Sequence, residues 1–374
     1  MRMLSLFSGI GAFEKALTNI GIDYELVNYC EVDKWASKSY SLIHNEGEDK
    51  NLWDITKIDI ESLPKNIDLI THGSPCQDFS IAGKQAGGDE GSNTRSSLMW
   101  NSVEIIKHCK PKYIIWENVK GVLQKKNIHN FEKYLSSLEN IGYKNYYKVL
   151  NSKDYGIPQN RERIFVVSIL GDDEFEFPTG ELLKINLFEL LDEYVDAQYY
   201  ISIDSFVKHN IKNIENIVEK RVGDFRYDEG FRIRKNNLSP TLTCKVGSSS
   251  LSANPLIFNK RIFDRYMNNV KTNLSDNGVG NNPCSREYVG LKEISPTLCA
   301  RDYKDPKIVK FLNQGLTIRK LTPKECWRLM GFDDKDVDIC INNGISNTQL
   351  YKQAGNSIVV NVLEEIFKSF LLEK

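Results

Sequence analysis

The 374-residue chain lacks the features that mark several protein classes. Its eight cysteines form no Cys-x-x-Cys pair and are accompanied by only five histidines, which argues against a zinc site and against a disulfide framework. No apolar run approaches the roughly 20 residues of a membrane-spanning helix. Glycine and serine interrupt the first apolar stretch, so it does not form a signal-peptide core. These absences predict a soluble cytoplasmic protein with no metal and no membrane partner.

Net charge is also almost absent, because 49 Lys and Arg oppose 50 Asp and Glu. That balance argues against a uniformly basic coat. It is an average over unlike parts, since residues 202–328 hold 23 basic and 13 acidic side chains, a local balance of +10, and the rest of the chain carries −11. We predict a basic, loop-rich second domain beside an acidic first one. A solvated irregular surface is the alternative that charge alone leaves open.

Short β-rich segments alternate with helical ones up to about residue 170, a pattern typical of a parallel sheet covered by helices. It predicts an α/β, doubly wound fold that binds ligands at the carboxyl ends of its strands. The helices include 13–20 and 97–108, and the predicted strands are Met3–Phe7, Tyr24–Cys30, Ile67–His72, Tyr113–Trp116, Tyr146–Leu150 and Ile164–Ile169.

The last part of the chain returns to helix. Thr322, Pro323 and Glu325 form a helix cap ahead of Cys326–Met330, and apolar residues at helical spacing follow from 358 to 370. Between the two helical parts, Ser-Pro-Thr-Leu occurs at 239–242 and again at 295–298, where each proline restrains the serine before it. The predicted domains are a catalytic and cofactor-binding domain at 1–195, a second domain at 196–335, and a segment at 336–374 that returns to the first.

A glycine-rich turn, Phe7-Ser8-Gly9-Ile10-Gly11, follows the first strand, and Glu31 ends the second. Glycines let a ligand approach the backbone, and an acid at this place can bind ribose hydroxyls. Because Glu14 occupies the place of the third glycine of a dinucleotide fingerprint, a nucleoside cofactor without a pyrophosphate is favoured. A bare structural turn is the alternative.

Cys76 lies beside a proline after the third strand and is placed for nucleophilic attack, although a buried inert thiol is the better reading of the cysteine alone. Glu117 follows the next strand at the same sheet edge, where a desolvated carboxyl can hold a proton. Arg161 and Arg163 are spaced to reach one side, where they could fix a substrate or reach a phosphate. Alternatively, they could form surface salt bridges with Glu162 or other acids.

The features described so far occur in a fixed order: the glycine turn, Glu31, Pro-Cys, Glu-Asn-Val, Gln-x-Arg-x-Arg and the terminal Gln-x-Gly-Asn-Ser. Together they closely resemble the motifs of the DNA cytosine-5 methyltransferases. The resemblance spans Leu4 to about Leu191, and Arg319 to the end. It implies a Rossmann-like domain that binds S-adenosyl-L-methionine and releases S-adenosyl-L-homocysteine, with a smaller, loop- and β-rich target-recognition domain. It implies cofactor contacts from Phe7, Gly9, Gly11, Glu31, Val32, Asp54, Ile55, Asn356 and Ser357.

Val32 departs from the family, since many members carry a Trp there, against the adenine. The resemblance also implies the mechanism. Cys76 adds to carbon 6 of a cytosine flipped out of the duplex, Glu117 hydrogen-bonds or protonates ring nitrogen 3, Arg163 orients the base, Arg161 assists, and carbon 5 takes the methyl group. Gly83–Arg95 resembles the loop that closes over the flipped base. The DNA-binding candidates are Lys84, Gln85, Arg95, Lys245, Arg301 and Lys304.

The expected partner is double-stranded DNA, with the protein a monomer in the bacterial cytoplasm. A restriction endonuclease for the same site, acting without a stable complex, is a further expected partner. Methylation of tRNA by the related DNA-methyltransferase-like family is an alternative, which the long, basic span from 196 to 330 disfavours. A catalytically silent DNA-binding protein is the alternative from a different class. An exocyclic amino-methyltransferase is disfavoured, since the loop that carries Cys76 lacks an Asn- or Asp-Pro-Pro-aromatic motif.

Overall fold

The computed structural model describes residues 1–75, 89–92, 94–200, 221–226, 230–234, 238–244, 254, 256–259 and 317–372. The chain forms two compact units, one made of Met1–Ile185 with Cys326–Lys374, the other of Asn186–Glu325. The first unit holds β1 (Arg2–Leu6), α1 (Ala12–Asn19), β2 (Glu25–Cys30), α2 (Lys34–His44), β3 (Leu69–His72), α3 (Met99–Cys109), β4 (Tyr113–Val119), α4 (Ile128–Glu139), β5 (Tyr143–Asn151), β6 (Glu162–Leu170), α9 (Asp334–Asn342), α10 (Asn347–Asn356) and α11 (Val360–Leu371).

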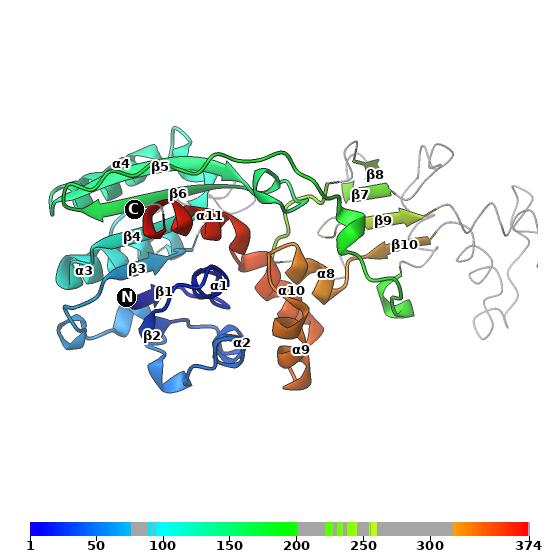
Figure 1. Ribbon diagram of the computed structural model, residues 1–374, viewed down its shortest axis with the longest axis horizontal. Coiled ribbons are helices and arrows are strands. Elements are labelled where there is room, and N and C mark those ends of the chain that lie inside the picture. The colour runs from blue at the N-terminus through cyan, green and yellow to red at the C-terminus, as the bar shows by residue number, and fades with distance from the viewer. Residues whose placement is uncertain are drawn as a thin grey trace, which may run out of the picture. The chain divides into compact units, whose positions relative to one another are not determined.

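Six strands of the first unit form one sheet in the order β2-β1-β3-β4-β6-β5 (Figure 1). The pairs β1–β2, β1–β3 and β3–β4 are parallel, whereas β6 runs antiparallel to both of its neighbours. The sheet is therefore mixed and mostly parallel. This confirms the predicted α/β class.

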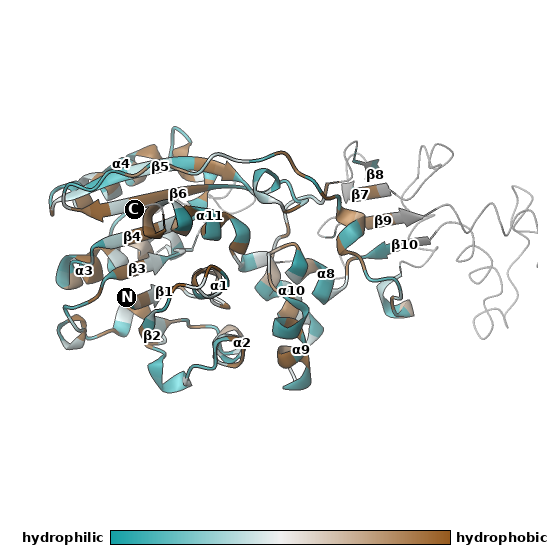
Figure 2. Ribbon diagram, viewed as in Figure 1, coloured by the Kyte–Doolittle hydropathy of each residue, from teal (hydrophilic) through white to brown (hydrophobic). Residues whose placement is uncertain are grey.

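Alternation along β4 shows how both faces of this sheet are covered. Tyr113 contacts Phe370 of α11, with ring centroids 5.0 Å apart, while Trp116 contacts Phe131 and Tyr134 of α4 on the opposite face. Helix α11 also packs beside α1, although the two come from opposite ends of the chain (Figure 1). Hydrophobic residues line the strands between these helical layers (Figure 2). The unit is thus doubly wound, as predicted.

Strands β4, β5 and β6 are longer than the hydrophobic pattern predicts. Strand β4 continues past Trp116 to Val119, because β6 pairs with it as far as Val119 opposite Arg163. Glu117 therefore lies within a paired strand rather than after it, directly across from β6. The pattern also did not predict α9 and α10, which precede the final helix.

The second unit contains an antiparallel sheet in the order β10-β9-β7-β8. The predicted helix cap is confirmed, since Thr322 N–H donates to Glu325 and Glu325 N–H donates to Thr322 Oγ1 at 3.2 Å. Within the described ranges, no helix is long and apolar enough to cross a membrane, and no group of three or more His, Cys, Asp or Glu could hold a metal ion. The elements here are β7 (Arg221–Arg226), β8 (Gly230–Ile233), β9 (Leu256–Asn259), β10 (Thr317–Lys320) and the start of α8 (Pro323–Arg328).

Candidate functional site

The turn after β1 is built from residues with left-handed backbone. Phe7, Gly9 and Gly11 have φ of 53°, 58° and 80°. The two glycines differ in what surrounds them. A Cβ on Gly9 would meet nothing within 4 Å, whereas a Cβ on Gly11 would lie 2.0 Å from Nε2 of His44. The backbone at Gly9 is therefore open to a ligand, whereas the space beside Gly11 is filled by the side chain of His44.

Glu31 fixes this turn to the end of β2. Its carboxylate accepts the N–H of Gly9 at 2.9 Å and that of Asp33 at 2.7 Å. The side-chain amide of Asn51 bonds both the N–H and the carbonyl of Glu31. Burial raises the pKa of Glu31, and the two backbone N–H groups oppose that shift. Because each carboxylate oxygen has two lone pairs, Glu31 can accept further hydroxyl donors.

The remaining cofactor candidates near β2 have unlike environments. Val32 is 72% exposed, whereas Ile55 belongs to the hydrophobic core. Asp54 accepts from the N–H and hydroxyl of Thr56, and these bonds lower the pKa of its carboxyl. Beside Asp54, Trp53 is 41% exposed and has a left-handed φ of 58°. Trp53 was not predicted from the sequence, because its exposure and its uncommon backbone conformation are properties of the fold.

Glu117 and Arg163 form an ion pair across β4 and β6. Arg163 Nε lies 3.0 Å from Glu117 Oε1, and only 17% and 11% of the two side chains are exposed. Burial raises the pKa of Glu117 more than the charges of Arg163 and Arg161 lower it. A Cβ on Gly73 would lie 3.7 Å from Glu117 Oε2, so the carboxyl flanks the start of the loop that carries Cys76. A protonated Glu117 can therefore donate a hydrogen bond here.

Arg161 has a different set of partners. Its Nη2 donates to the carbonyl of Ser357 at 2.6 Å and to that of Gly355 at 3.3 Å. The side chain thereby joins the start of β6 to the end of α10, where Asn356 is exposed, and to Ser357, which follows α10 and is buried. Glu162 forms an ion pair with Lys120, while Arg163 forms one with Glu117, whose side chain is buried rather than on the surface.

Ser74, in the segment between β3 and Cys76, is bonded to two residues of β4. Trp116 Nε1 donates to Ser74 Oγ at 2.9 Å, and Asn118 Nδ2 donates to Ser74 Oγ and to its carbonyl, both at 3.2 Å. All three residues are buried. Ser74 therefore holds the start of the segment that leads to Cys76 against β4, a role that the sequence did not predict.

Among the DNA-binding candidates, Arg95 is exposed at the start of a 3₁₀ turn capped by Thr94. The other predicted site residues lie outside the described residues, and their roles stay predictions: Cys76, Lys84, Gln85, Lys245, Arg301 and Lys304.

Comparison with known proteins identifies the family. The model of the C-5 cytosine-specific DNA methylases matches residues 1–371. The chain belongs to this family. Curated relatives of this methylase include the orphan methyltransferase M.SPRI of Bacillus phage SPR, which is 34% identical over 99% of this chain and 97% of its own length. The type II methyltransferase M2.ScrFI of Lactococcus lactis subsp. cremoris is 33% identical over 98% of both chains.

Solved structures share the fold of this methylase. The DNMT2 mutant of Spodoptera frugiperda covers 98% of each chain with a TM-score of 0.64 and 20% identity. The Dnmt2 methyltransferase of S. pombe covers 100% of this chain and 98% of its own with a TM-score of 0.62. The predicted Rossmann-like methyltransferase fold is confirmed by these neighbours together with the family match.

Proposed function

We propose that this protein is an S-adenosyl-L-methionine-dependent DNA cytosine-5 methyltransferase that acts through Cys76. The observation that carries the proposal is the buried pair of Glu117 and Arg163 beside Gly73, at the edge of the loop that leads to Cys76. A carboxyl of raised pKa and a guanidinium match the ring nitrogen and carbonyl of cytosine. The family match supplies the reaction class.

The cofactor site fits S-adenosyl-L-methionine. Gly9 offers backbone with open space above it, and the Glu31 carboxylate beside it has lone pairs for ribose hydroxyls. Asp54 and the backbone of Ile55 are proposed to read the adenine, with Asn356 and Ser357 closing the pocket. The bound cofactor supplies an electrophilic methyl group on a sulfonium.

In the proposed reaction, the Cys76 thiolate forms a bond to carbon 6 of a flipped cytosine while Glu117 donates a hydrogen bond or proton to nitrogen 3. The electron pair reaches carbon 5, which forms a bond to the methyl group as the carbon–sulfur bond of the cofactor breaks. A base removes the proton on carbon 5, and its electron pair restores the double bond and expels Cys76. Arg163 orients the base through its carbonyl, and Arg161 assists by holding Gly355 and Ser357.

The second unit is proposed to recognise the DNA sequence through Lys245, Arg301 and Lys304. Further contacts are proposed from Lys84, Gln85 and Arg95 of the closing loop, which belongs to the first unit. The local charge of +10 over residues 202–328 supports this, since neutralised phosphates release counterions. Binding to duplex DNA should therefore weaken steeply as salt rises. Affinity that does not respond to salt would remove this support.

Labelled S-adenosyl-L-methionine offered with duplex DNA and with tRNA separately tests the substrate. Label is expected in DNA alone, and label only in tRNA would defeat the proposal. Bisulfite sequencing of DNA from expressing cells should then show protected cytosines at one recurring sequence. Cys76→Ala should abolish this protection and prevent covalent trapping on 5-fluorocytosine DNA, whereas a catalytically silent DNA-binding protein would never give either signal.

We also propose that the protein acts as a monomer. Its relatives are named both as orphan and as type II methyltransferases, so an endonuclease for the same site is proposed as a functional partner only. Digestion of methylated and unmethylated host DNA with extracts of the source cells tests for such an enzyme. Sedimentation of the purified chain tests the monomer.

A further inference from the structure

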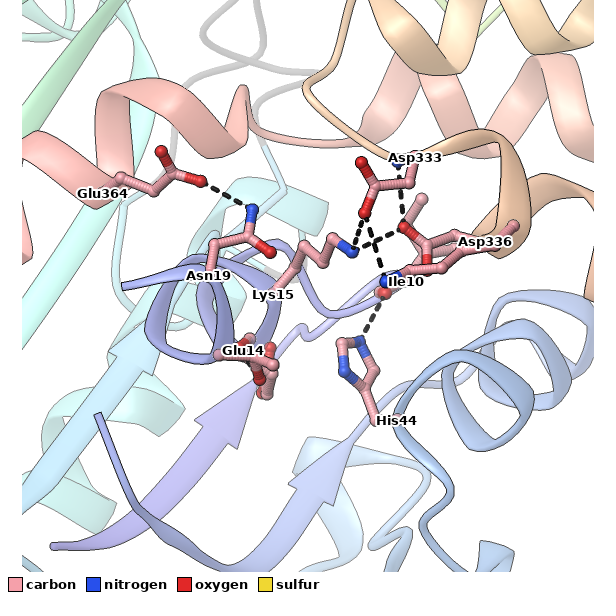
Figure 3. A network of polar contacts seen from close by, with 10 residues as sticks. Ile10, Glu14, Lys15, Asn19, His44, Asp333, Asp336 and Glu364 are labelled. Carbon is pink, nitrogen blue, oxygen red and sulfur yellow. Dashed lines mark hydrogen bonds and ion pairs between the residues drawn. The ribbon is translucent and has the colours of Figure 1, made fainter. Parts of the chain in front are cut away.

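The side chain of His44, the last residue of α2, contacts the glycine turn (Figure 3). Its Nε2 lies 3.0 Å from the carbonyl oxygen of Ile10. Burial lowers the pKa of His44, so the imidazole is neutral near pH 7 and Nε2–H donates to that oxygen. The ring also fills the space that a side chain at position 11 would need.

The Ile10–Gly11 peptide is held at both of its polar atoms. The carbonyl of Ile10 accepts from His44, and the N–H of Gly11 donates to the carbonyl of Ser8 at 2.9 Å. Since a trans peptide is planar, these two bonds set its orientation and hence the direction of the chain at Gly9. Gly9 in turn donates its N–H to Glu31 and keeps an open outer face.

Helix α2 is itself anchored to α1, the helix that the turn opens. The ring of His44 packs on Tyr40, whose hydroxyl donates to Glu14 Oε1 at 2.9 Å. The next residue, Lys15, forms a buried ion pair with Asp336 at 2.8 Å and a second ion pair, at 2.7 Å, with the exposed carboxylate of Asp333 (Figure 3). The charged groups around the imidazole are thus Glu14, Lys15 and Asp336. The contacts of these groups hold α1 and α2 in place, and the hydrogen bond of His44 then holds the glycine turn in place.

We propose that His44 is a positioning residue for the cofactor: its hydrogen bond to Ile10 keeps Gly9 and Glu31 in the arrangement that binds S-adenosyl-L-methionine. The inference rests on the proposed function. It also explains why residue 11 is a glycine. The motif suggests that the missing side chain makes room for the ligand, whereas here it makes room for the imidazole of His44.

A matched pair of substitutions separates the hydrogen bond from the packing of the ring. In His44→Gln the amide nitrogen sits about where Nε2 was, whereas in His44→Asn it reaches only as far as Nδ1, and both variants lack the ring. Calorimetry with S-adenosyl-L-homocysteine on the full chain should give about threefold weaker binding for Gln and more than about tenfold for Asn. The KM for S-adenosyl-L-methionine should follow, while kcat at saturating cofactor stays within about threefold of the wild type.

Equal affinity of both variants and the wild type would overturn the inference and leave the proposed function standing. A wild-type chain that does not bind S-adenosyl-L-homocysteine would instead overturn the proposed function. If circular dichroism shows that the Asn variant is unfolded, His44→Phe replaces it, because Phe keeps the ring and lacks the donor. Loss of cofactor affinity in a folded Phe variant supports the hydrogen bond, and wild-type affinity contradicts it.

Discussion

Ser74→Ala tests whether the bonds beneath the Cys76 loop stabilise the protein. The substitution removes the acceptor of Trp116 Nε1–H, which is fully buried, while Asn118 keeps its bond to the Ser74 carbonyl at 3.2 Å. A buried donor left without a partner costs about 1–3 kcal/mol. We expect the free energy of unfolding to fall by about that amount, and most of it should trace to the indole.

A double-mutant cycle isolates that contribution. Trp116→Phe removes the donor, so Ser74→Ala made in that background should cost about 1 kcal/mol less than in the wild type. Urea unfolding followed by circular dichroism measures all four proteins without relying on tryptophan fluorescence. Equal costs of Ser74→Ala in the two backgrounds would refute the argument.

The same variant has an expected effect on catalysis. Ser74 lies two residues before Cys76, so looser attachment of the loop should lower kcat for methylation while affinity for S-adenosyl-L-homocysteine stays unchanged. Ser74→Thr keeps the hydroxyl and is the control for added or lost volume. A Thr variant that loses as much stability as the Ala variant would show that packing, rather than the hydrogen bond, dominates at this position.

Three further predictions concern other residues of the first unit. Glu117→Gln should lower kcat by about 10²–10⁴ with unchanged affinity for S-adenosyl-L-homocysteine, and the wild-type kcat should fall as pH rises through the raised pKa of Glu117, because the protonated form donates. Gly11→Ala should weaken the affinity for S-adenosyl-L-homocysteine, because the new Cβ collides with His44. Adding His44→Ala to that variant removes the clash and should restore part of the affinity, as a double-mutant cycle of binding can measure. Lys15→Met should cost about 3 kcal/mol of unfolding free energy, because a buried carboxylate loses its cation. Lys15 also lowers the pKa of Asp333 below 3.8. The stability that this ion pair contributes is therefore present above pH 3.8 and is lost as the pH falls through the pKa of Asp333 in the folded protein. The difference in unfolding free energy between Lys15→Met and the wild type should therefore become smaller below about pH 4, as acid titrations can measure.

Periodicity and turn chemistry were enough to predict the layered fold. The strands β1 to β3 are short, apolar and bounded by turn residues, so their positions could be read within two residues. The extension of β4 to Val119 could not, because it depends on pairing with β6, a partner more than forty residues later in the chain. Pairing between distant strands overrides local hydrophobic pattern.

The candidate site divides in the same way. Glu31 and Glu117 could be assigned from their motifs, although Glu117 lies inside β4 and not after it. Ser74 and His44 could not, because a serine in a loop and a histidine at a helix end gain meaning only from the neighbours that folding provides. Arg161 shows the limit of alternation, since its position was predicted and its bonds to two carbonyls were not.

The placement of α11 has a consequence for biosynthesis. This helix covers the face of β4 on which Tyr113 lies, yet its residues, Val360–Leu371, leave the ribosome after the entire second unit. Until α11 has been synthesised, that apolar face of β4 is uncovered and can associate with other incomplete chains. Methylation competence should appear only after release of the finished chain, so a message truncated before residue 360 should yield aggregates rather than a partly active enzyme.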